Sequence, residues 1–510
     1  MAIMTETSAK HKSDLMSHLA SLRSLIESAS EEGSAVHELE HSLFRGLLQM
    51  GRMLLEEFFH RQGGGDVGDE FEVEPGRVLK RSAQKHRRRY VSLFGEFEFQ
   101  RYVYAPRAGQ RIEAVPLDAR LKLPAQSVSY LLSDWVQALA VEVAYRPVRD
   151  TFSRIFEVNL PVSLLERQNG VLGTSVEPFL EATPAKPSAE GEFVVVSADG
   201  KGVPMRRVGR RGAALAPSRR GPKVDKKRMA IVGAVYDAKA YPRNVDSVLK
   251  ALFSTAPKAA NDEGGVSSRD RPIAKLVRAA LPPGDEDELT PLARETIFRW
   301  LGEQVRARDP QGQKTVVVLI DGQHCLWDDA AGALAGCERV EILDLLHATA
   351  KLGEMTHVFY PPGHELERTA LRTFTRQLLT GQAGELIQMF RALAAEEKLS
   401  DQAQETIRQG CGYFDNHRHR MRYDRYLAAG YPIASGVIEG ACRHVVKDRL
   451  ERSGMRWVIE GAQPMLDLRC VAINGQWDAF IRFRVDQENA RLYPYDQRLD
   501  KLQWPQGIAA

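Results

Sequence analysis

The first sixty residues show a helical spacing of apolar positions. Apolar side chains recur at intervals of three and four in two runs: Leu15, Leu19, Leu22 and Ile26, then Leu43, Leu47, Met50, Leu54 and Phe58. This spacing places them along one face of a helix. We therefore expect two amphipathic helices within residues 1–62, and these are typical of a helical bundle or a dimerising arm.

In residues 63–107 the helical spacing gives way to a linker and an alternating pattern. The run Gly63-Gly64-Gly65 is typical of a flexible linker. Residues 80–89 are strongly basic and lead into residues 90–104, where aromatic and polar side chains alternate around Gly95. The alternation predicts a β-hairpin. The basic run, with Arg87 and Arg88 in it, is suited to neutralise phosphates, and a solvated charged face explains it equally well.

Helical spacing returns in residues 108–180. Two short helices are expected on either side of the turn Val158-Asn159-Leu160. This arrangement is compatible with a helix-turn-helix DNA reader, and helical packing without DNA is at least as common.

The pattern changes again at Phe193, where apolar runs begin. Four runs are apolar at nearly every position: 193–198, 229–236, 314–320 and 340–347. Continuous rather than alternating apolar residues predict strands that are buried on both faces, in a sheet covered by helices. Residues 261–288 are polar and are expected to form, in part, a surface loop. Residues 348–426 return to helical spacing, so an α/β core with a helical segment is the expected architecture.

The segment between the first two predicted strands, Lys201 to Arg228, is unusually basic. It holds eleven Lys and Arg residues against one acid, Asp225, a net of +10. Such a segment repels itself unless an anion lies along it, and a nucleic-acid backbone is the most fitting one. Its cations include Lys201, Arg206, Arg207, Arg210 and Arg211.

Three carboxylates form the candidate for chemistry. Asp199 and Asp321 each directly follow an apolar run and each precede a glycine, while Glu439 falls in the first turns of a helix expected after Gly436. Strands of an open α/β sheet place such ends at a shared edge, where active sites gather. Carboxylates brought together repel unless a proton or a divalent cation lies between them. Oxygen donors favour Mg²⁺ or Mn²⁺, and two such ions about 3.5–4 Å apart support phosphodiester chemistry.

Composition adds only broad limits. The chain has 510 residues, is 43% hydrophobic and carries a net charge of +3 from 70 Lys and Arg against 67 Asp and Glu, so bulk charge says little about partners. Its length predicts about three domains. Five scattered cysteines without a Cys-x-x-Cys pair are typical of free thiols in a reducing compartment. Because the N-terminus is polar and no run of about 18 apolar residues occurs, we expect a cytoplasmic protein without a membrane segment.

The chain resembles a known family in three blocks. These are residues 197–205, residues 227–236, and residues 434–440 continuing through 451–457. Together they look like the ISKra-type insertion-sequence transposases of bacteria, which are related to Mutator-like elements. The resemblance extends from Phe193 to Trp457 and is looser towards the N-terminus.

The resemblance implies a DDE enzyme with an RNase H-like core. In that family the first acid ends the first strand, the second ends the fourth, and the third lies on a later helix, which correspond here to Asp199, Asp321 and Glu439. The 118 residues between the last two (439 − 321) resemble relatives in which an all-helical insertion precedes the catalytic helix. The implied order is a core part at 191–347, an insertion at 348–432 and a second core part with the C-terminal tail at 433–510, after mainly helical N-terminal domains.

The same relatives carry a Cys/Asp-x-x-His motif after the second acid, and Asp344-Leu345-Leu346-His347 matches its aspartate form. His347 is therefore a candidate to contact DNA or to support the site, and a histidine satisfied by Asp344 at a helix start is an equal alternative. His324 is a weaker candidate. Arg443, Lys447 and Arg449 are suited to hold phosphates near the site, although a solvated helix face explains most of them as well.

The function expected from this resemblance is DNA transposition. Such an enzyme binds the inverted repeats at the ends of its own element, hydrolyses phosphodiester bonds there with Mg²⁺ and joins the freed ends to target DNA. A homodimer or larger assembly on paired ends and a location at the nucleoid are implied. Two alternatives stay open: an RNase H-like nuclease or resolvase that cuts without joining, and a DNA-binding protein that has kept the fold and lost catalysis.

Overall fold

The computed structural model describes residues 2–107, 109–188, 190–206, 227–254, 272–282, 291–452 and 454–499. Contacts divide the chain into two compact units. The first contains the residues up to Ser175 together with those from Trp477 on, and the second runs from Val176 to Gln476. The C-terminal tail was expected to belong with the second core part. It belongs instead to the first unit, because its helix α19 (Trp477–Leu492) packs on the helix Tyr130–Ala140 of that unit.

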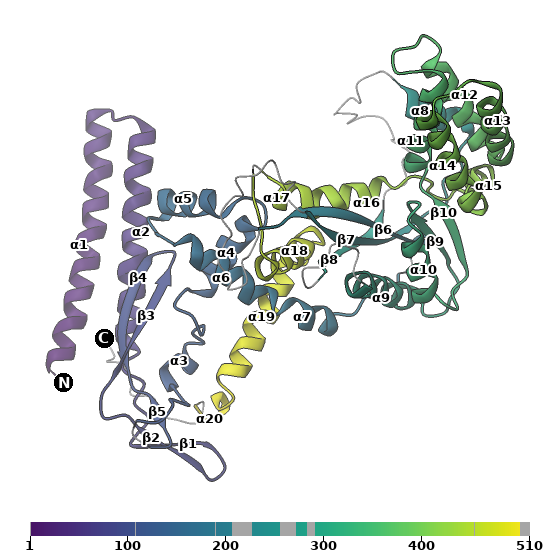
Figure 1. The fold of residues 1–510 in the computed structure, drawn as a ribbon. Coiled ribbons are helices and arrows are strands. Elements are labelled where there is room, and N and C mark those ends of the chain that lie inside the picture. Colours follow the sequence, from purple (N-terminus) through teal and green to yellow (C-terminus); the bar gives the residue numbers. More distant parts are fainter. Residues whose placement is uncertain are drawn as a thin grey trace, which may run out of the picture. The chain divides into compact units, whose positions relative to one another are not determined.

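The first unit begins with the two expected long helices, α1 (Ala2–Glu32) and α2 (Val36–Arg61). They form a hairpin in which Gly46 faces Leu22 (Figure 1). A Cβ atom at Gly46 would lie 2.3 Å from the Leu22 side chain. Glycine therefore sets how closely the two helices approach.

Two small sheets follow the hairpin. Strands β1 (Glu70–Glu74), β2 (Arg77–Arg81) and β5 (Tyr104–Ala105) form one sheet. Strands β3 (His86–Ser92) and β4 (Gly95–Arg101) form the other, an antiparallel pair closed by the turn before Gly95. The hairpin predicted around Gly95 is confirmed.

The rest of the first unit is helical. It consists of α3 (Pro116–Arg120), α4 (Tyr130–Ala140), α5 (Tyr145–Phe156), α6 (Val162–Gly173) and, from the C-terminal end, α19 and α20 (Asp496–Leu499). Helices α4, α5 and α6 pack on one another around Leu132, Val136 and Phe152. The two short helices on either side of residues 158–160 are thus present, within a three-helix cluster that is built by ordinary apolar packing.

A five-stranded mixed sheet forms the centre of the second unit. Its strands are β6 (Phe193–Pro204), β7 (Lys227–Ala238), β8 (Ile273–Ala280), β9 (Thr315–Ile320) and β10 (Arg339–Leu343). The order across the sheet is β10-β9-β6-β7-β8. Strands β6, β9 and β10 are parallel, and β7 is antiparallel to both β6 and β8. Strands β6, β7 and β8 therefore form an antiparallel meander, and β9 and β10 extend the sheet in parallel on the other side of β6.

Three strands differ from the sequence-based expectation. Strand β6 does not end at Asp199 but continues to Pro204, because it stays paired with β7 as far as Lys227. Strand β8 lies in a stretch that was expected to be partly a surface loop, and its polar positions are tolerated because it lies at the edge of the sheet. Strand β10 stops at Leu343, because the Asp344 side chain caps the helix that follows.

Helices cover the sheet and build the main core of the unit. Those that pack on the strands are α9 (Pro291–Arg308), α10 (His324–Ala333) and α18 (Ile459–Ile473), whereas α7 (Val176–Ala182) packs on α18 and α8 (Val245–Phe253) packs on the helix Glu367–Leu379 of the cluster described next. Gly233 of β7 leaves room for Ile297 of α9, since a Cβ atom there would lie 2.6 Å from that side chain. The sheet residues Val195, Val317 and Ile342 are fully buried in this core.

Between β10 and residue 436 the chain is helical, as expected. The helices are α11 (Leu345–Phe359), α12 (Glu367–Leu379), α13 (Ala383–Glu396), α14 (Asp401–His417), a 3-10 turn (Arg418–Arg420) and α15 (Tyr423–Ala429). Figure 1 shows them gathered as a cluster beside the β10 end of the sheet. Then follow α16 (Gly436–Ala441), a π-helical turn η2 (Cys442–Lys447) and α17 (Asp448–Leu450). None of the helices in the described ranges is long and apolar enough to cross a membrane.

Candidate acidic site

Asp199 lies on β6 just beyond the part of this strand that pairs with β9. The parallel pairing of β6 with β9 ends at Val196 opposite Val318, whereas β7 still accompanies Asp199. Ser197 is buried in β6 two residues before Asp199, and its hydroxyl donates a hydrogen bond of 2.5 Å to the carbonyl of Leu319. The two strand ends that lead to the two aspartates are therefore joined by a buried hydrogen bond.

Asp321 directly follows β9, and its loop is fixed from three sides. Its Oδ1 accepts the backbone N–H of Gln323 at 3.0 Å, and its carbonyl accepts the indole N–H of Trp327 at 2.8 Å. The ring of His417, from α14, lies 3.1 Å from the carbonyl of Gly322 through Nε2. A helix of the inserted cluster thus contributes directly to the position of the second acid.

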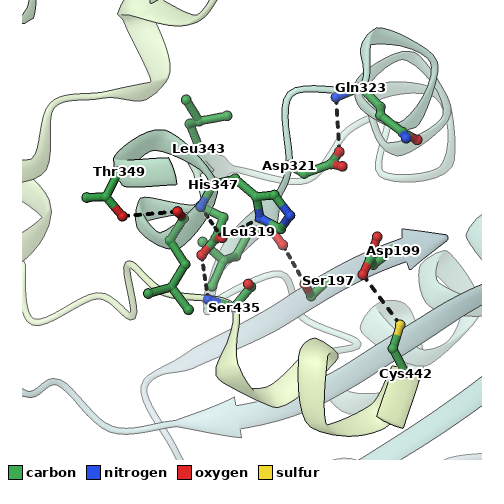
Figure 2. A network of polar contacts seen from close by, with 12 residues as sticks. Ser197, Asp199, Leu319, Asp321, Gln323, Leu343, His347, Thr349, Ser435 and Cys442 are labelled. Carbon is green, nitrogen blue, oxygen red and sulfur yellow. Dashed lines mark hydrogen bonds and ion pairs between the residues drawn. The ribbon is translucent and has the colours of Figure 1, made fainter. Parts of the chain in front are cut away.

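The two aspartates lie within electrostatic reach of each other (Figure 2). Burial raises the pKa of Asp321, the N–H of Gln323 partly offsets this, and the negative charge of Asp199 raises the pKa further. Among the described residues neither aspartate has a Lys or Arg ion-pair partner. A pair of carboxylates that repel in this way favours a bound divalent cation or a shared proton.

Glu439 is exposed on the first turn of α16, and the next turn brings Cys442 to Asp199. The thiol of Cys442 donates to Oδ2 of Asp199 at 3.5 Å. Burial raises the pKa of this thiol, and the charges of Asp199 and Glu439 raise it further. Glu439 and Asp199 thus both act on the Cys442 thiol. Within the described residues no three Asp, Glu, His or Cys side chains form a preformed metal cluster.

Asp344 connects the two halves of the second unit that are separated by the helical cluster. Its side chain is buried and accepts three hydrogen bonds: from the backbone N–H of Ser435 at 2.6 Å, from the backbone N–H of His347 at 3.0 Å and from Nδ1 of His347 at 2.6 Å. Burial alone would raise the pKa of Asp344, but these hydrogen bonds outweigh it and lower the pKa. Leu345 N–H also donates to the carbonyl of Ile433 at 2.9 Å. The chain that leads to Glu439 is therefore fastened to the end of β10.

His347 is held by Asp344 at the start of α11, which is one of the two alternatives left open by the sequence. Its hydrogen bond to Asp344 raises its pKa to about 9, burial opposes this, and the charges of Asp321 and Asp199 add to the rise. The ring is therefore protonated at neutral pH. Its side chain is 42% exposed. His347 thus places a positive charge beside the two aspartates while one ring nitrogen is held by Asp344.

The basic residues predicted to bind DNA have different surroundings. Lys201 lies on β6 two residues beyond Asp199, and its charge acts on Cys442. Lys447 is exposed on η2, whereas the exposed Arg443 lies 3.6 Å from Asp448. Arg449 is wrong as a phosphate ligand, because it is buried with its guanidinium 5.0 Å above the ring of Trp457.

Arg206 pairs its backbone N–H with the carbonyl of Trp457 at 2.7 Å, and its side chain is exposed. The predicted ligands Arg207, Arg210 and Arg211 lie outside the described residues. The outer parts of the basic segment are strands rather than loop, because Lys201 belongs to β6 and Lys227 begins β7.

In the first unit Arg87 and Arg88 both have partners within the protein. Arg87 forms an ion pair with Glu98 across the β3–β4 hairpin. Arg88 is partly buried and donates to the carbonyl of Gln126 at 2.8 Å and to that of Pro124. Arg88 is therefore explained by its structural role, while Arg87 stays exposed beside its glutamate.

Three residues of the site were missed in the sequence. His417 and Tyr413 come from α14 and face the Asp321 loop; a Cβ atom at Gly322 would lie 2.1 Å from the Tyr413 ring. Burial raises the pKa of Tyr413, and so does the charge of Asp321. Cys442 follows Glu439 by three residues, a spacing that places both on one helix face. That spacing was the one available signal, since nothing local to α14 indicates what its side chains touch.

Comparison with known proteins does not assign the chain to a family. No protein-family model matches the chain. No curated protein matches it either.

Proposed function

We propose that this chain is a DDE-type DNA transposase of an insertion sequence, with an RNase H-like core. The proposal is supported most by one observation: Asp199 on the first strand of the sheet and Asp321 after the fourth lie within electrostatic reach of each other. These are the two strands on which the family resemblance implies the first and second acids. The two aspartates repel each other and have no Lys or Arg ion-pair partner in the described ranges, which suits a site that binds a divalent cation.

The carboxylates of Asp199 and Asp321 would hold Mg²⁺ or Mn²⁺, with Glu439 as the third ligand from α16. The three proposed ligands all offer carboxylate oxygens and include no cysteine or histidine, which fits a hard cation. When bound, a pair of such ions would supply an activated water and stabilise the leaving oxygen of a phosphodiester. The protein itself holds the acids in place. The Ser197 hydroxyl joins β6 to the end of β9, and the Asp344 side chain after β10 holds the segment that leads to Glu439.

Double-stranded DNA is the proposed substrate, both as the element's inverted repeats and as target. The supporting features are three cations: Lys201 on β6, two residues beyond Asp199, the exposed Lys447 on η2, and the protonated, partly exposed His347 beside the aspartates. Phosphate contacts of this kind position the duplex without reading its sequence. We further propose that the protein acts in the bacterial cytoplasm, at the nucleoid.

The test is a cleavage and joining assay on DNA that carries the inverted repeats flanking the gene. Asp199→Asn, Asp321→Asn and Glu439→Gln should each lower Mg²⁺-dependent cleavage at least a hundredfold. Asp328→Asn, the same change at an exposed position of α10, should not. Full cleavage by the three site variants would refute the catalytic assignment. Cleavage without joined products would instead assign a nuclease.

Metal binding offers a readout that does not need the DNA sequence. Mg²⁺ should raise the Tm of the wild-type protein by preferential binding to the folded state. In EDTA, Asp199→Asn and Asp321→Asn should raise the Tm, because each removes a repelling charge and keeps its hydrogen bond to a backbone N–H. Both variants should lose the Mg²⁺-induced rise. An unchanged rise in both would exclude these aspartates as metal ligands.

A further inference from the structure

The α1–α2 hairpin has one apolar and one polar face. On each helix, several of the residues that face the other helix are directly followed in sequence by a large exposed apolar residue. These are Met16, Leu19 and Ile26 on α1, and Phe44, Leu47, Leu54 and Phe58 on α2, each between 39% and 58% exposed. On α2 they follow the spacing 44, 47, 51, 54, 58, alternating three and four, which is the pattern of a helix that packs on another helix.

The two apolar stripes lie on the same side of the hairpin. When two antiparallel helices pack together, the residues that directly follow the interface positions point to the same side of the pair on both helices. Because Leu22 faces Gly46, Leu19 lies near the level of Leu47. Ile26 and Phe44 are level by the same register, and the stripes therefore form one continuous apolar surface. At Gly51 the gap in the α2 stripe is filled by the ring of Phe94, which is itself 39% exposed.

The opposite face of the hairpin is polar along its whole length. Its exposed residues include Asp14, Ser17, Ser21, Ser24 and Ser28 on α1, and Glu38, Ser42, Gln49 and Glu56 on α2. Arg45 and Arg52 on the same face bind polar groups of the first unit, Glu157 and the carbonyl of Glu96. One face thus serves water and polar contacts within the unit, and the other is built for an apolar partner.

Charge and size indicate what that partner is. The stripes contain two charged residues, Arg23 and Glu40, and neither has an ion-pair partner in the part of the chain that the structure describes. One cation and one anion do not suit a phosphate backbone, but they are self-complementary when the face meets a copy of itself. The stripe on α2 runs from Glu40 to Phe58, about 28 Å, and two helices about 10 Å wide give a face of roughly 570 Å². Two copies together would bury about 1,100 Å², which is above the roughly 1,000 Å² expected of a biological interface.

We propose that this apolar face binds the same face of a second copy of the chain, so that two hairpins form a four-helix bundle and the protein is a homodimer in solution. The contact depends on residues of the first unit alone. It requires neither DNA nor the catalytic assignment, so it stands or fails independently of the proposed function.

The test compares two matched pairs of substitutions in the full-length protein by light scattering after size exclusion. The apolar-face variant is Leu19→Glu with Leu47→Glu, and the polar-face control is Ser24→Glu with Gln49→Glu. The chain mass is 57.1 kDa. Wild type and control should give twice that value without DNA, and the apolar-face variant should give the monomer mass with the far-UV circular dichroism of the wild type.

A wild-type protein that is monomeric at tens of micromolar would overturn the proposal and would mean that the face is covered within its own chain. A dimer that survives in the apolar-face variant would overturn it as well. If the glutamates unfold the hairpin, the pair Leu19→Ser with Leu47→Ser takes their place. These milder changes should weaken dimerisation at least tenfold in sedimentation, and an unchanged dissociation constant would refute the interface.

Discussion

The thiol of Cys442 and the carboxylate of Asp199 form a hydrogen bond of 3.5 Å between a π-helical turn and the central strand of the sheet. This contact is what ties the helix of Glu439 to the first aspartate. Single π-turns occur often at functional sites, where the extra residue redirects side chains. Here the turn begins at Cys442 itself, so its geometry and the contact with Asp199 depend on each other.

Cys442 should be among the least reactive thiols of the folded protein. Burial and the neighbouring Asp199 raise its pKa, so the thiolate that reacts with electrophiles is scarce at pH 8. Cys325 and Cys337 are partly exposed and serve as internal references. We expect iodoacetamide to label these two at least tenfold faster than Cys442, as measured by peptide mass spectrometry. In guanidinium all should react alike, and equally fast labelling of Cys442 in the native protein would contradict its described environment.

Replacing Asp344 should destabilise the second unit and loosen the Glu439 segment specifically. Asp344→Ala removes the cap of α11 and leaves the N–H of Ser435 without an acceptor in a buried place. The loss of a cap costs about 1 kcal/mol and an orphaned buried donor about 1–3 kcal/mol, so we expect a total of about 3 kcal/mol in urea unfolding. Hydrogen exchange in residues 433–441 should accelerate.

The exposed Asp328 provides the control for Asp344. Asp328→Ala, on α10, should change stability by less than about 0.5 kcal/mol, as surface substitutions usually do. His347→Ala removes only one of the three donors to Asp344 and should have a smaller effect than Asp344→Ala. Exchange in residues 433–441 that stays as in the wild type after Asp344→Ala would show that Asp344 does not hold this segment.

Continuous apolar runs predicted strands β6, β7, β9 and β10, and β8 was missed. Val194 and Val317 lie in the middle of the sheet, where such runs are buried on both faces. Strand β8 lies at the edge of the sheet, and its first half is exposed or partly exposed, with Lys275 exposed, while Val277 in its second half is buried. Its neighbours in sequence are polar, so the apolar signal was diluted and the stretch was expected to be partly a surface loop.

The acids were identifiable from the sequence, but the contacts that hold them were not. Asp199 and Asp321 follow apolar runs, which is a local signal. Of the side chains that fix the Asp321 loop, His417 comes from α14, nearly a hundred residues later, and the spacing on α14 indicates only a helix. Asp344 could be read as a helix cap from its position, yet its bond to Ser435 depends on how the chain returns from the helical cluster.

His417 should make stability depend on pH in the acidic range. The ring is buried; burial, and then the charge of Arg420, lower its pKa to about 4. The unfolded chain, with a histidine pKa of about 6.5, takes up the proton first, so the stability contribution is present above pH 6.5 and is lost as the pH falls towards 4. When the pH is lowered from 7 to 5, we expect His417 to reduce the free energy of unfolding by about 2 kcal/mol. His417→Gln should flatten the pH dependence of urea unfolding by that amount.

The comparison for His417 is His37→Gln on the exposed surface of α2, which should leave the pH dependence unchanged. Because His417 also contacts the carbonyl of Gly322, the glutamine variant will be less stable at pH 7. The informative quantity is therefore the slope between pH 7 and 5. A slope equal to that of the wild type would show that His417 is not held neutral.

Asp467 should act in the opposite direction. It lies on α18 in the wall of a cavity of about 920 Å³ within the second unit, where Gln463 donates to its Oδ1 at 2.8 Å. Asp467 is partly buried, and burial raises its pKa to about 7. The unfolded chain ionises first, at about pH 3.9, so the folded state loses stability as the pH rises from 4 to 7.

Asp467→Asn removes that ionisation and keeps an oxygen for the Gln463 amide. The variant should be more stable than the wild type by on the order of 2 kcal/mol at pH 8, less than the full linkage because the cavity admits water, and by less at pH 5. Thermal unfolding at the two pH values measures the difference, with Asp328→Asn as the same change at an exposed position. A gain of equal size at pH 5 and pH 8 would show that hydrogen bonding rather than ionisation of Asp467 sets the effect. A loss at pH 8 would show that the ionised carboxylate is stabilised in the fold, which would reverse the direction of its pKa shift.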